Sequence, residues 1–150
     1  SISSTKIRNA LELGDIDLAN QYLGYSYFLS GTVVKGKQLG RTIGFPTANI
    51  DLEEAYKLVP KNGVYVVAAE IDGKTVFGMM NIGFNPTVQG QNRTIEVHFF
   101  DFDSDIYDRQ IRVAVLQRIR SEEKFGSVEL LTNQLKKDRD FSKNYLQNLK

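Results

Sequence analysis

The sequence has no cysteine, no tryptophan and only one histidine among its 150 residues. Without cysteine the chain forms no disulfide, no cysteine-ligated zinc site and no thiolate nucleophile, and this composition agrees with a reducing cytosol. The single histidine, His98, excludes histidine-based metal clusters and twin-histidine motifs. We therefore expect a cytoplasmic protein whose chemistry rests on oxygen-bearing and cationic side chains.

The chain also lacks an excess of charge of either sign and lacks long apolar runs. Its 19 basic and 18 acidic residues give a formal net charge of +1, which creates no global field for nucleic acid or an anionic membrane. No apolar run approaches the ~20 residues that span a bilayer. A hydrophobic content of 41% and a charged content of 25% are ordinary for one globular domain of this length. We expect neither nucleic acid nor membrane as a partner.

Segments rich in β-branched and aromatic residues follow Tyr25, separated by turn residues such as Asp72-Gly73. Because no helical pattern lies between them, they favour an antiparallel barrel over a parallel doubly wound sheet. The predicted fold is a six-stranded antiparallel, Greek-key-type barrel with strands over residues 27–35, 48–52, 64–71, 75–82, 94–100 and 110–119. A turn is predicted over 89–92.

Helix signals occur at both ends of the chain. Ser3 or Ser4 predicts the start of a short helix that Gly14 ends, and Asp15 or Asp17 predicts a second one that ends at Gly24. A long C-terminal helix is predicted to follow Ser127 and to lie across the barrel. Its apolar face would hold residues 128, 131, 135, 145 and 149, with a loosened stretch over 138–142.

The least ordinary segment is a loop with two glycines and a proline, Gly40-Arg41-Thr42-Ile43-Gly44-Phe45-Pro46-Thr47-Ala48-Asn49. Its glycines let the backbone approach a ligand closely, and its proline stiffens the turn. Thr47 and Asn49 lie two apart in an extended segment, so their oxygens point to the same side. Two neutral oxygens beside such a loop suit Mg²⁺, which takes further ligands from phosphates and water. The alternative interpretation is an ordinary turn that feeds a strand.

This segment and several correctly spaced companions resemble the riboflavin kinase family, most closely the kinase module of the bifunctional bacterial FAD synthetases. The resembling stretches are Gly31-Thr32-Val33-Val34-Lys35-Gly36, residues 40–49, Asn62-Gly63-Val64-Tyr65, Asn81-Ile82-Gly83-Phe84-Asn85-Pro86-Thr87, Ile95-Glu96-Val97-His98 and Glu123-Lys124-Phe125. They extend over roughly residues 25–146. A ten-residue motif with companions is far more specific than a lone glycine pattern.

The resemblance implies a flavoprotein of FAD biosynthesis that moves the γ-phosphoryl group of ATP to the 5′-hydroxyl of riboflavin. The products are FMN and ADP, and Mg²⁺ is the implied cofactor. Thr47 and Asn49 match the metal-binding pair of the family, and Glu96 matches its catalytic glutamate, the general base. The ATP site is expected to comprise Lys35, Gly36, Lys37, Gly40, Arg41, Gly44, Pro46, Thr47 and Asn49.

The flavin ring is expected near the segment that joins the last strand to the C-terminal helix, with Arg120, Glu122 and Phe125 as its contacts. Relatives commonly have proline where this chain has Ser121. Phe125 has an alternative role as an aromatic that fills the core.

Strand alternation predicts that the Glu96 side chain points to the opposite face of its strand from Ile95 and Val97. The alternative interpretation of Glu96 is a glutamate that only faces solvent.

Residues 1–24 differ in character from residues 25–150, the expected riboflavin kinase domain. The segment Ser1-Ile2-Ser3-Ser4-Thr5-Lys6-Ile7-Arg8 resembles the last conserved segment of the adenylyltransferase domain in the bifunctional enzymes. We expect a remnant or linker there, and a longer natural polypeptide with an N-terminal FMN adenylyltransferase domain. We expect no adenylyltransferase activity in the present chain.

One alternative function belongs to another class: a non-catalytic barrel that binds a nucleotide, a flavin or single-stranded nucleic acid. Such a binding module would need a basic groove with interleaved aromatic residues, and it gives no reason for the combination of Thr47, Asn49 and Glu96.

Two further motifs match a known pattern only in part. Residues 31–37 match a P-loop, but Gln38 stands where the Mg²⁺-binding hydroxyl is needed, and residues 101–105 begin like an EF-hand that lacks its glycine and its final glutamate.

Overall fold

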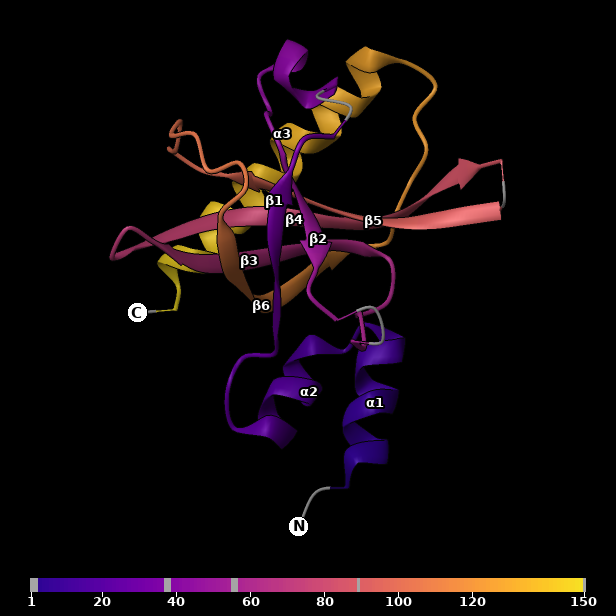
Figure 1. Cartoon of the computed structure of the whole chain (residues 1–150), viewed down its shortest axis with the longest axis vertical. Coiled ribbons are helices and arrows are strands. Elements are labelled where there is room, and N and C mark those ends of the chain that lie inside the picture. The colour runs from indigo at the N-terminus through magenta and orange to yellow at the C-terminus, as the bar shows by residue number, and fades with distance from the viewer. Residues whose placement is uncertain (1–2, 37–38, 55–56, 89, 150) are drawn as a thin grey trace.

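The computed structural model describes residues 3–36, 39–54, 57–88 and 90–149. Two short helices come first, and a long helix comes last (Figure 1). The helices are α1 (Ser4–Leu13), α2 (Ile16–Leu23) and α3 (Val128–Gln147), with a 3-10 helix η1 (Leu39–Ile43) after the first strand. The strands are β1 (Phe28–Val34), β2 (Ala48–Leu52), β3 (Gly63–Ile71), β4 (Lys74–Thr87), β5 (Gly90–Phe99) and β6 (Gln110–Arg120).

The six strands form a closed antiparallel barrel with the order β1-β2-β5-β4-β3-β6. Every second residue along a strand points into the barrel interior, as Ile111, Val113 and Val115 do on β6. Alternation gives each strand one apolar face, and the closed barrel brings these faces together around one interior. The predicted fold class is confirmed.

The N-terminal helices begin and end at the predicted residues and pack on one end of the barrel (Figure 1). The Ser3 hydroxyl accepts a hydrogen bond from the Lys6 amide at 3.3 Å, and Gly14 ends α1 in the left-handed conformation. Leu11 and Ile16 are each 1% exposed and lie in the same hydrophobic cluster as the barrel interior. These helices are therefore part of the core.

The hairpin of β4 and β5 is longer than predicted. The prediction ended these strands at residues 82 and 94, whereas the backbones pair out to Thr87 and Gly90. The predicted turn over 89–92 is thus wrong for residues 90–92, which belong to β5. Glycine, proline and asparagine are depleted in strands and led to the early ending. Pairing continues beyond residue 82, and the Arg93 guanidinium lies 4.9 Å from the Phe84 ring across the strands.

The C-terminal helix α3 runs without interruption along the outside of the barrel (Figure 1). The predicted loosening over 138–142 is wrong, because Asp138 and Ser142 are buried against the barrel and hydrogen-bonded. The predicted apolar positions Val128 and Leu149 are instead 55% exposed. In the part of the chain that the structure describes, no helix is both long enough and apolar enough to cross a membrane.

A second, smaller hydrophobic cluster joins α3 to the outer face of the barrel. Its buried members are Phe45, Val64, Met79 and Phe100, and Leu135 and Leu146 of α3 pack against them. Val64 and Met79 are neighbours in space on β3 and β4, and their side chains point away from the barrel interior. The cluster is incomplete at the N-terminal end of α3, where a cavity lies between helix and barrel.

Candidate active site

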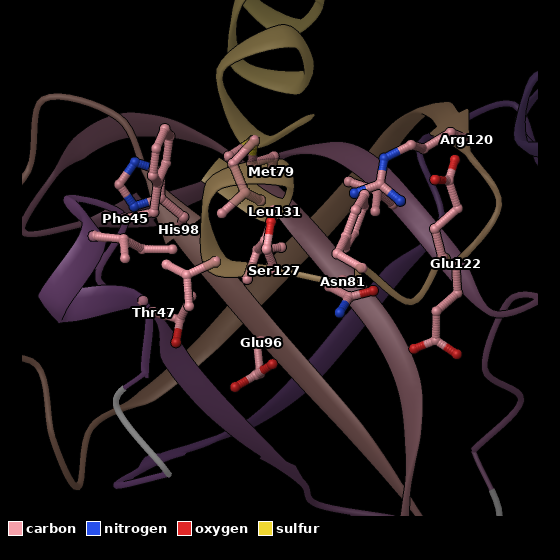
Figure 2. A pocket seen from close by; sticks show the side chains of 17 residues that line it. Phe45, Thr47, Met79, Asn81, Glu96, His98, Arg120, Glu122, Ser127 and Leu131 are labelled. Atoms are coloured by element: carbon pink, nitrogen blue, oxygen red, sulfur yellow. The ribbon is translucent and has the colours of Figure 1, made fainter. Parts of the chain in front are cut away.

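A cavity of about 540 Å³ lies between the outer face of the barrel and the N-terminal half of α3 (Figure 2). It brings together six of the residues predicted from the sequence: Gly40, Thr47, Glu96, Arg120, Glu122 and Phe125. Its remaining walls are largely apolar and come from Ile43, Phe45, Val64, Met79, Val128, Leu131 and Leu135, with Asn81, His98, Glu123 and Ser127 as further polar lining.

One row of paired residues crosses the barrel through this site. Asn49 on β2 pairs with Glu96 on β5, Glu96 pairs with Asn81 on β4, Asn81 with Val64 on β3, and Val64 with Arg120 on β6. Glu96 thus lies between two carboxamide side chains on neighbouring strands. Directly paired residues have Cβ atoms about 4.5–5.5 Å apart, so the row forms one contiguous surface.

The outward direction of Glu96 follows from the burial of its neighbours. Ile95 is 5% exposed and Val97 is fully buried, and both lie in the barrel cluster. Glu96 must point to the opposite face, and there it meets the cavity rather than open solvent. Figure 2 shows its carboxylate between Thr47 and Asn81.

The turn that precedes Thr47 is held in place by its own backbone. Gly44 ends η1 in the left-handed conformation with φ of 86°, and the Phe45 amide donates to the Gly40 carbonyl at 2.7 Å. This bond is the 6→1 bond of a Schellman-type ending, which glycine favours. Phe45 is then buried at 4% exposure, and the chain leaves in an extended direction at Thr47.

A second glycine, Gly36, makes room for Asn49. A Cβ atom on Gly36 would stand 2.0 Å from the Asn49 Nδ2 atom, which is closer than any real contact. The carboxamide of Asn49 therefore packs directly on the Gly36 backbone. Any side chain at position 36 would displace it.

His98 fixes the same turn from the barrel side. Its Nδ1 atom lies 2.7 Å from the Pro46 carbonyl oxygen, so Nδ1 carries the hydrogen and donates it. The ring packs edge-on between Phe45 and Phe100. Burial lowers the pKa of His98, and the nearby positive charges of Arg139 and Lys143 lower it too, although the Pro46 bond acts in the opposite direction.

Acid is expected to destabilise the protein through His98. Because its folded pKa is lower than its unfolded pKa of about 6.5, the unfolded chain takes up the proton first as the pH falls. The stability is therefore full above pH ~6.5 and falls below it. His98→Asn keeps a donor for Pro46 but does not titrate, so chemical denaturation at pH 7.5 and 5.5 should show a smaller loss in the variant. An equal loss in both proteins would contradict this role.

Arg120 lines the cavity, but its guanidinium is held by α3. Its Nε and Nη2 atoms bind the Asp138 carboxylate at 2.8–3.1 Å, and Nη1 donates to the Ser121 carbonyl at 3.0 Å. The Gln134 amide donates to the same carboxylate at 2.9 Å. The guanidinium also lies 5.7 Å from the Phe125 ring. Arg120 thus anchors the segment between β6 and α3 that walls the cavity.

A second cavity of about 400 Å³ lies on the other side of Thr47. Arg41, Pro46 and Thr47 line it together with the acidic turn between β5 and β6, whose members there are Phe102, Asp103, Ser104, Asp105, Ile106 and Tyr107. Lys35 approaches this cavity, with its Nζ atom 5.2 Å from the Tyr107 ring. Thr47 is therefore a wall shared by both cavities.

The residues predicted to bind ATP are thus distributed around Thr47. Arg41 and Pro46 face the second cavity, Gly40 faces the first, Gly44 shapes the turn, and Gly36 supports Asn49. Lys37 lies outside the described residues. Across those residues, no group of three or more His, Asp or Glu side chains is placed to hold a metal ion.

Asn81 in the cavity and Asp138 behind it received no role from the sequence. Strand alternation places Asn81 on the outer face of β4 once the strand is known, but only the register of β4 with β5 pairs it with Glu96. Asp138 would require knowing which strand α3 packs against. The charged residues Lys136, Lys137, Arg139 and Asp140 surround Asp138 in the sequence, so local sequence gave no signal of its burial.

The chain is similar in sequence to several known proteins. Residues 23–146 match the riboflavin kinase family model. The chain is 45% identical over 152 residues to the bifunctional riboflavin kinase/FMN adenylyltransferase of Bacillus subtilis, covering 99% of this chain and 48% of that protein. It is 49% identical over 138 residues to the protein of the same name from Listeria monocytogenes, covering 91% and 44%. The chain spans about half the length of the curated relatives it matches.

Two solved structures share the fold. A Streptococcus pneumoniae structure described as a macrolide-efflux protein has a TM-score of 0.89 and 42% identity, over 96% of this chain and 47% of that one. The riboflavin kinase of Trypanosoma brucei has a TM-score of 0.55 and 31% identity, over 80% of this chain and 79% of that one.

Proposed function

Since the chain belongs to the riboflavin kinase family, we propose that it transfers the γ-phosphoryl group of ATP to the 5′-hydroxyl of riboflavin. The observation that carries this proposal is the shared wall at Thr47, where two cavities meet beside Glu96. Phosphoryl transfer needs a donor site and an acceptor site that touch at one point, and it needs a base at that point.

We assign riboflavin to the cavity under α3 and ATP to the cavity beyond Thr47. The first has apolar walls from Val64, Met79 and Leu131, which suit a flat aromatic ring. The second is lined by Arg41 and approached by Lys35, whose positive charges suit a triphosphate, and the carboxylates of Asp103 and Asp105 line the same cavity. The transferred group then crosses from one cavity to the other beside Thr47.

Glu96 is the proposed general base for the 5′-hydroxyl. A carboxylate in hydrogen-bond reach of the acceptor takes its proton as the oxygen attacks phosphorus. The oxygens of Thr47 and Asn49 fit Mg²⁺, because this ion prefers oxygen donors and keeps positions for phosphate and water. Mg²⁺ would neutralise charge on the phosphates when bound. Gly36 supports this fit by holding the Asn49 carboxamide in place.

We assign residues 25–150 to the kinase domain and residues 1–24 to the end of an adenylyltransferase domain that a longer protein would carry. The family match begins at residue 23, which supports this boundary, and relatives about twice as long support a further domain. The chain by itself should make FMN but not FAD, and its lack of cysteine agrees with activity in the cytosol.

The proposal is tested by incubating the purified chain with riboflavin, ATP and Mg²⁺ and separating the flavins by chromatography. FMN should form, should depend on Mg²⁺, and should not be followed by FAD. If riboflavin or ATP binds and no FMN forms, the chain is a binding module and the kinase proposal fails for it.

Replacing Asn49 with alanine should weaken Mg²⁺-dependent nucleotide binding and turnover together. Loss of one ligand worth ~1.4 kcal/mol raises the Mg²⁺ concentration for half-maximal rate by about tenfold. Asn133→Ala, an exposed site on α3, is the matched control and should change nothing. Activity of Asn49→Ala with an unaltered Mg²⁺ dependence would remove Asn49 from the metal site.

A further inference from the structure

Asn81 carries a buried polar atom that the fold does not explain. Its Oδ1 atom has no hydrogen-bond partner, although nearly all buried polar atoms in proteins have one. Its neighbours along the cavity wall are the apolar side chains of Val64 and Met79 and the Glu96 carboxylate, which only accepts hydrogen bonds and so offers no donor to Oδ1. An apolar residue would fill this place at lower cost, so the carboxamide requires a reason outside packing.

The order of residues along the cavity supplies that reason. Thr47 lies at the phosphate end, and Glu96 follows on β5. Asn81 comes next on β4, and Arg120 and Glu122 lie beyond it (Figure 2). Neighbouring strands are about 4.8 Å apart, so Asn81 stands one strand spacing from the base on the side of the ring-binding end.

This inference rests on the proposed function: a riboflavin with its 5′-hydroxyl at Glu96 and its ring beyond Asn81 must run its ribityl chain past Asn81. We propose that the Asn81 carboxamide binds the secondary hydroxyls of that chain and so selects a polyol-bearing flavin. Each hydroxyl is a donor and an acceptor, and a carboxamide offers both roles. Rotation of the amide presents its oxygen or its nitrogen to the chain.

The test compares riboflavin with lumiflavin, which keeps the ring but lacks the hydroxyls, by quenching of flavin fluorescence. Asn81→Ala should weaken riboflavin binding by about tenfold and leave lumiflavin and ATP binding unchanged. Asn62→Ala is the matched control, since Asn62 also has a buried unpartnered carboxamide oxygen and lies outside the cavity lining. It should bind both flavins as the wild type does.

Asn81→Leu provides a second variant that fills the same space without polar atoms. It should retain or raise the melting temperature while riboflavin binding falls, because it removes an unpaired buried oxygen. Unchanged riboflavin binding in both Asn81 variants would overturn the role of Asn81 without affecting the proposed function. An equal loss of binding for riboflavin and lumiflavin would do the same. A wild-type chain that binds no riboflavin would overturn the proposed function with it.

Discussion

Replacing Glu96 with glutamine is expected to lower turnover by about 10²–10⁴-fold, the usual contribution of a general base. Glutamine keeps the size of the side chain, but it replaces one acceptor oxygen by an NH₂ donor and does not accept the proton of the attacking hydroxyl. Because Glu96 lines the cavity at the centre of a paired row of residues, the substitution leaves the walls intact. Binding of riboflavin and of ATP should therefore stay within a few-fold of the wild type.

Steady-state FMN formation and flavin fluorescence titration separate these two effects. Glu12→Gln, an exposed residue of α1, is the matched control and should retain full turnover. Turnover of Glu96→Gln equal to the wild type would exclude Glu96 as the base. A loss of turnover that merely follows a loss of riboflavin binding would assign it a binding role instead.

Replacing Asp138 with asparagine is expected to destabilise the protein by about 3–5 kcal/mol, because it leaves the Arg120 guanidinium buried without its counter-ion. The side chains are 16% exposed for Arg120 and 1% for Asp138, and three hydrogen bonds join them. For a chain of this length the loss corresponds to a fall in melting temperature of roughly 6–20 °C. Riboflavin binding should weaken too, because Arg120 anchors Ser121 and Phe125 at the cavity.

Asp140→Asn is the matched control on the same helix. Asp140 pairs with Arg139 at 3.4 Å, but its side chain is 73% exposed, so the substitution should cost less than about 1 kcal/mol. The double variant Arg120→Met with Asp138→Leu removes both charges and should recover much of the stability. Denaturation midpoints near the wild type for Asp138→Asn would show that the pair contributes little.

Local chemistry made several elements predictable. Ser3, Asp15 and Ser127 cap helices as expected, and β2 begins and ends at the predicted residues. Caps and alternation act within a few residues of the chain, so one sequence contains the full signal. The meeting of Thr47 and Glu96 in one cavity was expected from resemblance, since nothing in the spacing of residues 47 and 96 encodes it.

What the sequence did not predict depends on pairing between distant segments. The extension of β4 to Thr87 is favoured by its partner strand against local propensity. The position of Asn81 opposite Glu96 requires the strand register, and the bond between Arg120 and Asp138 requires the packing of α3. Asp138 was predicted to lie in a loosened stretch of the helix and is instead 1% exposed, because its partner Arg120 lies on β6, 18 residues away in the sequence.

Labelling the γ-phosphoryl group shows directly whether the chain moves it to the 5′-hydroxyl of riboflavin. The chain is incubated with Mg²⁺ and ATP labelled with ³²P at the γ-position, together with either riboflavin or 5′-deoxyriboflavin, which lacks the acceptor hydroxyl. Labelled FMN should form from riboflavin, and no labelled flavin should form from the deoxy compound. No label on either flavin, or label on the deoxy compound, would contradict transfer to a 5′-hydroxyl held at Glu96.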